Sequence, residues 1–130
     1  MSRILFVDDE TMITETLSIA LNRKVPEYEI VGAASVDEAM SRLREQEFDV
    51  VVTDVQMPEK TGFDLLAEIR ADARLRTLPV IVITGMGDQE MKRQAIDNGA
   101  DDLLAKPVSV ADLIVRLKSC LLYTSPSPRD

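Results

Sequence analysis

The segment ILFVDDE, from Ile4 to Glu10, decides how this chain folds and where its chemistry lies. Four apolar residues are followed by three carboxylates with no basic residue beside them. Two carboxylates about 4 Å apart repel each other by roughly 1 kcal/mol in water and by about 4 kcal/mol near a protein surface. A buried strand that ends in such a cluster is most readily kept where a cation or a proton offsets the charge.

Composition limits the classes of protein that the chain can belong to. Its 130 residues suit one domain with a sizeable core, and its single cysteine cannot form an internal disulfide. The absence of histidine excludes histidine acid–base catalysis and histidine metal ligation, and the net charge of −8 argues against a nucleic-acid surface. No apolar run is long enough to span a membrane, and the first strand starts too near Met1 for a signal peptide, so we expect a cytoplasmic protein.

The end of the chain, CLLYTSPSPRD from Cys120 to Asp130, differs from the rest. It is similar to the in-frame translation of a transposase adapter used in sequencing libraries, and a natural Ser/Pro-rich linker is the alternative. We therefore expect residues 1–119 to form the domain and residues 120–130 to be an adapter-derived or disordered tail. On this hypothesis a following domain has been lost.

Apolar, β-branched segments alternate with amphipathic helical patterns along the rest of the chain. The predicted strands are Arg3–Val7, Tyr28–Ala33, Asp49–Thr53, Pro79–Thr84 and Asp101–Ala105. Runs such as VVVT and VIVIT lack strict alternation, which is typical of strands covered on both faces. The predicted helix N-terminal capping pairs are Ser35 with Glu38, Thr61 with Asp64, and Ser109 with Asp112. Five βα units predict an α/β fold with a parallel sheet between two layers of helices.

Polar residues follow the carboxyl ends of four predicted strands: Asp8 with Asp9, Asp54, Thr84 and Lys106. A parallel sheet brings these ends to one edge, where ligands of such folds bind. Three carboxylates there suit a hard divalent cation such as Mg²⁺. Lys106 adds a point charge suited to a phosphate oxygen, and Thr84 adds a hydroxyl donor.

Each of these residues also has a simpler interpretation. Asp8 and Asp9 could cap the following helix, since acids favour helix N-termini, although one acid would suffice. Asp54 could be a turn residue, and Lys106 could be an ordinary solvated lysine. The functional interpretation is favoured because all of them fall at one edge of the predicted sheet.

Four segments together resemble the CheY-like receiver domain of two-component response regulators. They are LFVDDE, VVTDVQMPEKTGFDLL, VIVITG and NGADDLLAKPV, and the resemblance runs from Arg3 to about Ser119. It implies a doubly wound, flavodoxin-like sheet in the order 2-1-3-4-5, with five helices on both faces. It also implies a phosphoacceptor that takes a phosphoryl group from a histidine kinase or a phosphotransfer protein and then switches its interactions with an output partner. Such a domain promotes its own phosphorylation and dephosphorylation and is not otherwise an enzyme.

The resemblance assigns roles to the residues at the sheet edge. Asp54 matches the phosphoacceptor, Thr84 the switch hydroxyl, and Lys106 the lysine that pairs with the phosphoryl group. The implied Mg²⁺ ligands are Asp8, Asp9, Asp54 and the backbone carbonyl of Gln56. The Lys106–Pro107 peptide bond matches one that is cis in the family.

The chain departs from the family pattern at several positions. Leu103 replaces the usual Tyr or Phe that couples the switch hydroxyl to the output face, so that coupling is in question. Gly85 stands where Ala is commoner, and Val108 where Phe is commoner. Gln56 and Met86 occupy positions that tune the lifetime of the acyl phosphate.

Two other functions stay open. The first is a receiver-like interaction module that does not switch, motivated by Leu103 and Gly85. The second is a small phosphohydrolase with an aspartyl nucleophile, although such enzymes commonly carry a second acid where this chain has Gln56. Dinucleotide binding is disfavoured because no G-x-G-x-x-G follows the first strand. A phosphorylation-dependent dimer through the fourth helix, fifth strand and fifth helix is a family property that Leu103 would weaken.

Overall fold

A computed structural model describes residues 2–85 and 89–124, and strands and helices alternate throughout this part of the chain. The strands are β1 (Ser2–Val7), β2 (Tyr28–Ala33), β3 (Val50–Asp54), β4 (Val80–Thr84) and β5 (Asp102–Ala105). The helices are α1 (Thr11–Lys24), α2 (Val36–Glu45), α3 (Gly62–Ala71), α4 (Gln89–Asp97) and α5 (Val110–Thr124). Each strand begins within one residue of its predicted start, and β2 matches its prediction at both ends.

The strands form one parallel sheet in the order β2-β1-β3-β4-β5, as the resemblance implied. The chain moves outward from β1 to β2, then returns past β1 to β3, so the strand order reverses between β1 and β3. Ligands of doubly wound sheets bind at this kind of switch point. The register pairs Val7 with Thr53, which places Asp8 and Asp54 one residue further along neighbouring strands.

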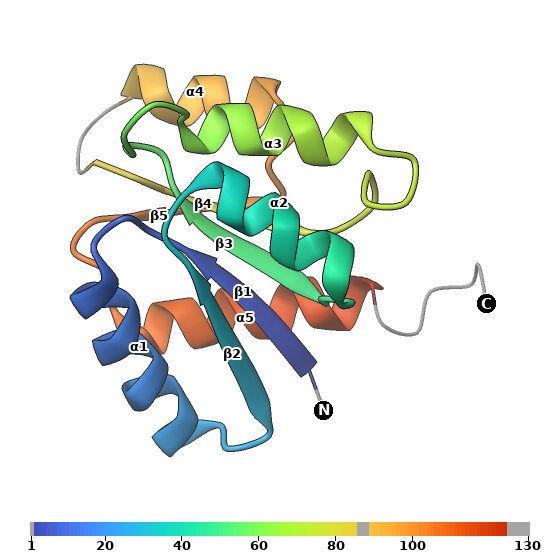
Figure 1. Ribbon diagram of the computed structural model, residues 1–130. Coiled ribbons are helices and arrows are strands. Elements are labelled where there is room, and N and C mark those ends of the chain that lie inside the picture. Colours follow the sequence, from blue (N-terminus) through green and yellow to red (C-terminus); the bar gives the residue numbers. More distant parts are fainter. Residues whose placement is uncertain (1, 86–88, 125–130) are drawn as a thin grey trace.

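Helices cover both faces of the sheet, with α1 and α5 on one face and α2, α3 and α4 on the other (Figure 1). Alternate residues of β1 serve the two layers: Ile4 and Phe6 pack with α1 and α5, whereas Leu5 and Val7 pack with α2 and α3. All four side chains are fully buried. The unbroken apolar run of β1 is therefore explained by a strand that is covered on both sides.

The helix starts follow the predicted caps in three places. Thr61 and Asp64 form a complete capping box at α3. The Ser35 hydroxyl accepts a hydrogen bond from the Glu38 N–H, and the Ser109 hydroxyl accepts one from the Asp112 N–H. By contrast, the residue that caps α1 is Glu10, and its side chain makes no capping bond. Neither Asp8 nor Asp9 is therefore the cap residue of α1, although Asp8 accepts a hydrogen bond from the Glu10 N–H.

The C-terminal helix extends past the predicted domain boundary. α5 continues to Thr124, and Cys120 is buried in the layer of α1 and α5. The boundary at residue 119 thus falls inside a helix, and the origin of the segment that begins at Cys120 stays a prediction. Residues 86–88, just before α4, and residues 125–130 lie outside the described residues. Within the described part, no helix combines the length and apolar character needed to cross a membrane.

The loop between β3 and α3 is constrained by a close backbone contact, a backbone hydrogen bond and one residue with a positive φ. A Cβ added to Gly62 would lie 2.4 Å from the backbone oxygen of Asp54, so only glycine permits this approach of α3 to β3. The Gly62 N–H also donates to the Val55 carbonyl at 2.9 Å, which closes the loop at its base. Glu59 has a φ of 68°, a left-handed conformation that is unfavourable for a residue with a Cβ.

We predict that Glu59→Gly stabilises the domain by about 0.5–1 kcal/mol, because glycine adopts positive φ without the steric penalty. The gain is smaller than the full penalty, since glycine also loses more chain entropy on folding. Urea denaturation measures the free energy of unfolding. Glu59→Ala is the control, since it removes the same charge but keeps the Cβ; an equal gain from both variants would contradict the backbone explanation.

We predict that Gly62→Ala destabilises the domain by about 1–3 kcal/mol, because the new methyl group must displace the end of β3 or the start of α3. Gly85→Ala is the matched control, since a Cβ added there meets no atom within 4 Å. Thermal and urea unfolding of both variants would test the prediction. Equal stabilities for the two variants would show that the close approach at Gly62 is not limiting.

Candidate functional site

Three carboxylates meet where β1 and β3 end, and we call Asp8, Asp9 and Asp54 the acid cluster. One oxygen from each lies within 4.8 Å of the other two. Asp8 and Asp54 are each only 3% exposed, whereas Asp9 is exposed. The sheet register produces this convergence, because both buried acids directly follow the paired residues Val7 and Thr53.

The buried position of Asp8 has an electrostatic cost. Burial raises the pKa of the Asp8 carboxyl above its ordinary value of 3.8; a hydrogen bond from the Glu10 N–H lowers it, and the negative charge of Asp54 raises it further. That hydrogen bond is 2.9 Å long and holds Asp8 Oδ1 in place. The fold thus maintains a carboxylate where its charged form is disfavoured.

Lys106 offsets part of the negative charge. Its Nζ donates to Asp54 Oδ2 at 2.8 Å, and this hydrogen bond is the main reason that the pKa of Lys106 is raised. Asp8 and Glu10 contribute to the same shift through their charges. The lysine comes from the end of β5, and its peptide bond to Pro107 is cis, as the resemblance implied.

Thr84 brings a buried hydroxyl to the same edge. The residue is 1% exposed, and its Oγ1 has no hydrogen-bond partner in the described structure. Its carbonyl accepts a hydrogen bond of 2.9 Å from the Lys106 N–H, so the ends of β4 and β5 are tied together. A buried hydroxyl without a partner is costly, and a ligand oxygen at the sheet edge would give it one.

Gln56 lies in the loop that follows the phosphoacceptor candidate. It is exposed, and its N–H donates to Asp54 Oδ1 at 3.3 Å. The two oxygens of Asp54 are therefore held separately, one by a backbone N–H and the other by Lys106. The role of the Gln56 carbonyl as a metal ligand stays a prediction.

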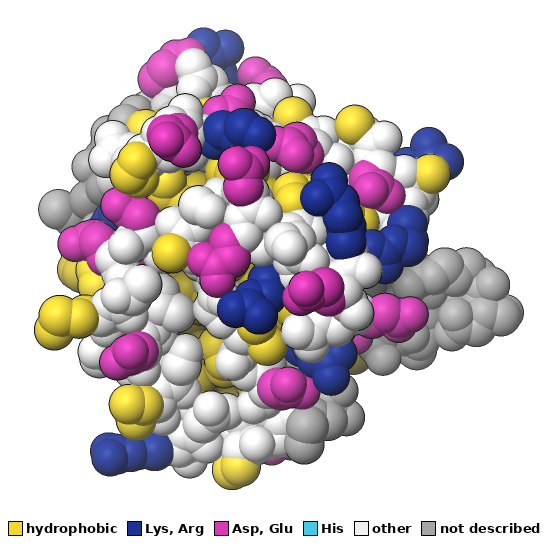
Figure 2. Space-filling view, in the orientation of Figure 1, with side chains coloured by type: hydrophobic (Ala, Val, Ile, Leu, Met, Phe, Trp, Pro, Cys, Tyr) yellow, Lys and Arg dark blue, Asp and Glu magenta, His cyan; other side chains and the backbone are white. Residues whose placement is uncertain are grey.

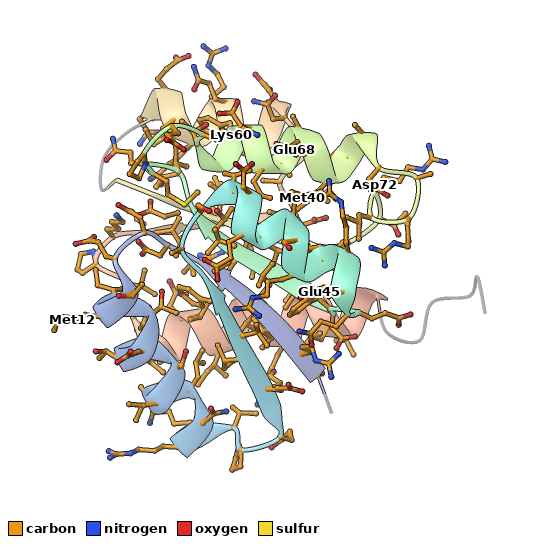
Figure 3. The ribbon with its side chains drawn as sticks, viewed as in Figure 1. Met12, Met40, Glu45, Lys60, Glu68 and Asp72 are labelled. Carbon is orange, nitrogen blue, oxygen red and sulfur yellow. The ribbon has the colours of Figure 1, made fainter. Side chains whose placement is uncertain are left out.

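Two residues near the site were not singled out from the sequence. The Lys60 Nζ donates to Asp37 Oδ1 at 3.0 Å and lies 3.6 Å from Glu68 Oε2, so it ties the loop after β3 to α2 and α3 (Figure 3). Nothing local could have revealed this, because Asp37 is distant in sequence. Glu10 affects Lys106 electrostatically, and its place in the run of three acids was a usable signal.

The positions where the sequence departs from the family pattern lie around this site. Leu103, on β5, is half-buried and packs against the core beneath α2, α3 and α4. Val108 is half-buried on the opposite face, with α1 and α5. Gly85 follows Thr84 in open space, and Met86 lies outside the described residues.

The donor set fits a hard divalent cation that keeps some of its waters. Carboxylate oxygens are the ligands that Mg²⁺ prefers, and two of the three acids here are buried with only one lysine to neutralise them. The orphaned hydroxyl of Thr84 and the ammonium of Lys106 add two donors suited to the oxygens of an anion. The donor set therefore suits a cation, and its two hydrogen-bond donors suit the oxygens of an anion.

Comparison with known proteins agrees with this chemistry. The family "Response regulator receiver domain" matches residues 4–118. The phosphate regulon transcriptional regulatory protein PhoB of Pseudomonas aeruginosa is 32% identical over 123 residues, which are 95% of this chain and 53% of that protein. The master transcriptional regulator RpaA of Synechocystis is 30% identical over 129 residues, 99% of this chain and 53% of that protein. The chain thus spans about half the length of these curated relatives.

Solved structures are similar over nearly the whole chain. The chemotaxis protein CheY4 of Vibrio cholerae matches with a TM-score of 0.85 and 30% identity, covering 93% of this chain and 99% of that one. The receiver domain of a histidine kinase from Syntrophus aciditrophicus matches with a TM-score of 0.86 and 29% identity, covering 100% of this chain and 95% of that one. The fold, the acid cluster and the family match agree, and the chain belongs to the response regulator receiver domains of two-component signalling systems.

Proposed function

We propose that Asp54 is the phosphoacceptor of this receiver and that its phosphorylation changes how the domain interacts with an output partner. The observation that carries the proposal is the arrangement around Asp54. Its carboxylate is 3% exposed, belongs to the acid cluster, and lies 2.8 Å from the Lys106 ammonium. Burial shields the Asp54 carboxylate from solvent. A phosphoryl donor would approach it from the carboxyl edge of the sheet.

The residues at the edge of the sheet have different roles in the proposed phosphoryl transfer. An oxygen of Asp54 attacks phosphorus as the bond to the donor nitrogen breaks, and the electron pair of that bond stays on the imidazole of the donor. Lys106 exchanges its contact with Asp54 for a phosphoryl oxygen, and the Thr84 hydroxyl donates to another. Mg²⁺, held by the acid cluster and the Gln56 carbonyl, would supply the positive charge that lets two anions approach.

The donor is a histidine kinase or a phosphotransfer protein, because this chain has no histidine of its own. PhoB and RpaA are about twice as long as the matched region, so the output partner in this proposal is either a further domain or a separate protein. Direct DNA binding by this domain is disfavoured by its net charge of −8. The face in Figure 2 also carries interspersed acidic and basic side chains rather than a basic stripe. We place the protein in the cytoplasm, where such kinases present their phosphohistidine.

A second candidate function is a receiver that binds its partner without switching. Leu103 favours it, because an aliphatic side chain packed into the core offers no hydroxyl or ring to follow a movement of Thr84. The same residue weakens the case for a phosphorylation-dependent dimer through α4, β5 and α5. Phosphohydrolase activity is the least supported alternative, since Gln56 stands where a second acid would be needed.

We expect acetyl phosphate with Mg²⁺ to add one phosphate to the wild-type chain and none to Asp54→Asn, as measured by intact mass. Lys106→Met should slow adduct formation at least about tenfold, because it removes a donor to the transferring group. Asp49→Asn is a control, since Asp49 lies at the opposite end of β3, where it accepts a hydrogen bond from the Arg3 N–H. A folded wild type that binds Mg²⁺ but stays unlabelled would contradict the proposal.

We expect Asp8→Asn to raise the free energy of unfolding by about 1 kcal/mol at neutral pH without Mg²⁺, because it removes repulsion within the acid cluster. Since the folded pKa of Asp8 is raised, its destabilising charge is lost as the pH falls from neutral toward 3.8, so the difference from wild type should shrink there. Asp9→Asn is the exposed control and should change stability less.

With Mg²⁺ present, the wild type should become more stable than the Asp8→Asn variant. At ten times its dissociation constant, a cation that binds only the folded state stabilises the wild type by about 1.4 kcal/mol. The Asp8→Asn variant should gain much less, because it lacks one buried ligand. Thermal unfolding with and without Mg²⁺ measures both effects, and an equal gain for the two proteins would exclude Asp8 as a ligand.

A further inference from the structure

An apolar cleft of about 500 Å³ opens beside the acid cluster, between α1 and the segment that joins β5 to α5. Its apolar lining consists of Ile13, Leu17, Ile83, Pro107 and Val108. Asp8 and Lys106 also line it, so the cleft and the proposed phosphorylation site share an end. We call this feature the Ile13 cleft.

The cleft is open because its two walls are not in full contact. On the α1 side, Ile13 is 40% exposed although it lines the cleft together with Leu17. On the other side, Val108 is half-buried and Pro107 is exposed. The floor is well ordered by packing, since Leu17 is 9% and Ile83 is 2% exposed. A preformed apolar recess with charged groups at one end is the usual character of a small-ligand site.

We propose that the Ile13 cleft binds the apolar acyl group of a small acyl phosphate while Asp54 takes the phosphoryl group. The inference rests on the proposed function of Asp54 and adds to it a subsite for the acyl group of the donor. In the reaction, an Asp54 oxygen forms a bond to phosphorus, and the bond from phosphorus to the acyl oxygen breaks. Its electron pair leaves with the carboxylate product, so no proton or further reactant is needed.

The charges around the cleft restrict the donor further. Glu10 lines the cleft, and Asp8 lies at its inner end. A donor with a second carboxylate on its acyl group would place a negative charge close to both acids, and like charges repel each other. An uncharged aromatic or branched acyl group would instead bury apolar surface against Ile13, Leu17 and Val108. The cleft should therefore favour benzoyl phosphate over donors of equal size that carry an extra acid.

The test compares two donors on the same protein. Rates of adduct formation on Asp54 are measured by intact mass with benzoyl phosphate and with acetyl phosphate, both with Mg²⁺. The ratio of the two rates is the readout, because it cancels any general effect of a variant on phosphoryl transfer. Val108→Phe fills the cleft, and Ile13→Ser removes an apolar wall from a partly exposed position. Ile19→Ser is the matched control, since Ile19 is 58% exposed on the same helix and does not line the cleft.

We expect the benzoyl-to-acetyl ratio to fall about three- to tenfold in Val108→Phe and in Ile13→Ser, and to stay unchanged in Ile19→Ser. The acetyl phosphate rate itself should change little in all three. An unchanged ratio in both cleft variants, with normal acetyl phosphate labelling, would overturn this inference and leave the proposed function intact. Failure of acetyl phosphate to label the folded wild type would instead overturn the proposed function, and this inference with it.

Discussion

The repulsion between two buried carboxylates at neighbouring strand ends is the constraint on which the rest of this structure depends. Parallel pairing of β1 with β3 places Asp8 beside Asp54, and the helices on both faces bury them. Neither acid can escape to solvent without a change in the sheet register, because a shift of one residue would turn every core side chain of β1 to the opposite layer. The hydrophobic core thus holds the acids together, and the site exists because the core is stable.

Lys106 offsets only part of the repulsion between Asp8 and Asp54. It bonds one oxygen of Asp54, while Asp8 is left with a backbone N–H and a raised pKa. A second lysine beside Asp8 would have neutralised more of the cluster, and it would also have taken space at the edge of the sheet. The domain therefore retains an unfavourable charge arrangement that a bound cation or a proton would relieve. This is expected where stability is sacrificed for function.

Much of this arrangement could be predicted from the sequence because it depends on rules that act along the chain. Unbroken apolar runs defined the strands, and the rule that parallel strands share a carboxyl edge brought Asp8, Asp54, Thr84 and Lys106 together. The strand order came from the resemblance rather than from the pattern. Asp8 does not occupy the cap position of α1, which Glu10 takes, but it accepts a hydrogen bond from the Glu10 N–H.

Other features could not be predicted, because they depend on how distant segments approach each other. The contact of Gly62 with the backbone of Asp54 is visible only once α3 is placed against β3. The bond from Lys60 to Asp37 joins a loop to a helix in another part of the chain, and the Ile13 cleft arises from imperfect contact between α1 and the segment after β5. The end of α5 also passed the expected boundary, since residues such as Cys120 and Leu121 are apolar enough to continue its buried face.

The two sides of the site differ in how tightly they are packed. This difference affects how a signal could pass through the domain. On the α1 and α5 side there is an open apolar cleft, which suits the approach of a donor. On the other side, the loop after β3 is closed by the Gly62 N–H and tied by Lys60 to α2 and α3, so it resists displacement. Movement in response to phosphorylation should then be taken up at the ends of β4 and β5, where Thr84 lacks a partner and is joined to Lys106 through the backbone. From there it can reach α4 through the packing of that helix against β4 and β5, in which Leu103 takes part. Because Leu103 has no ring or hydroxyl that could follow Thr84, the output of this receiver should depend more on how α4 packs against the sheet than on the orientation of one side chain.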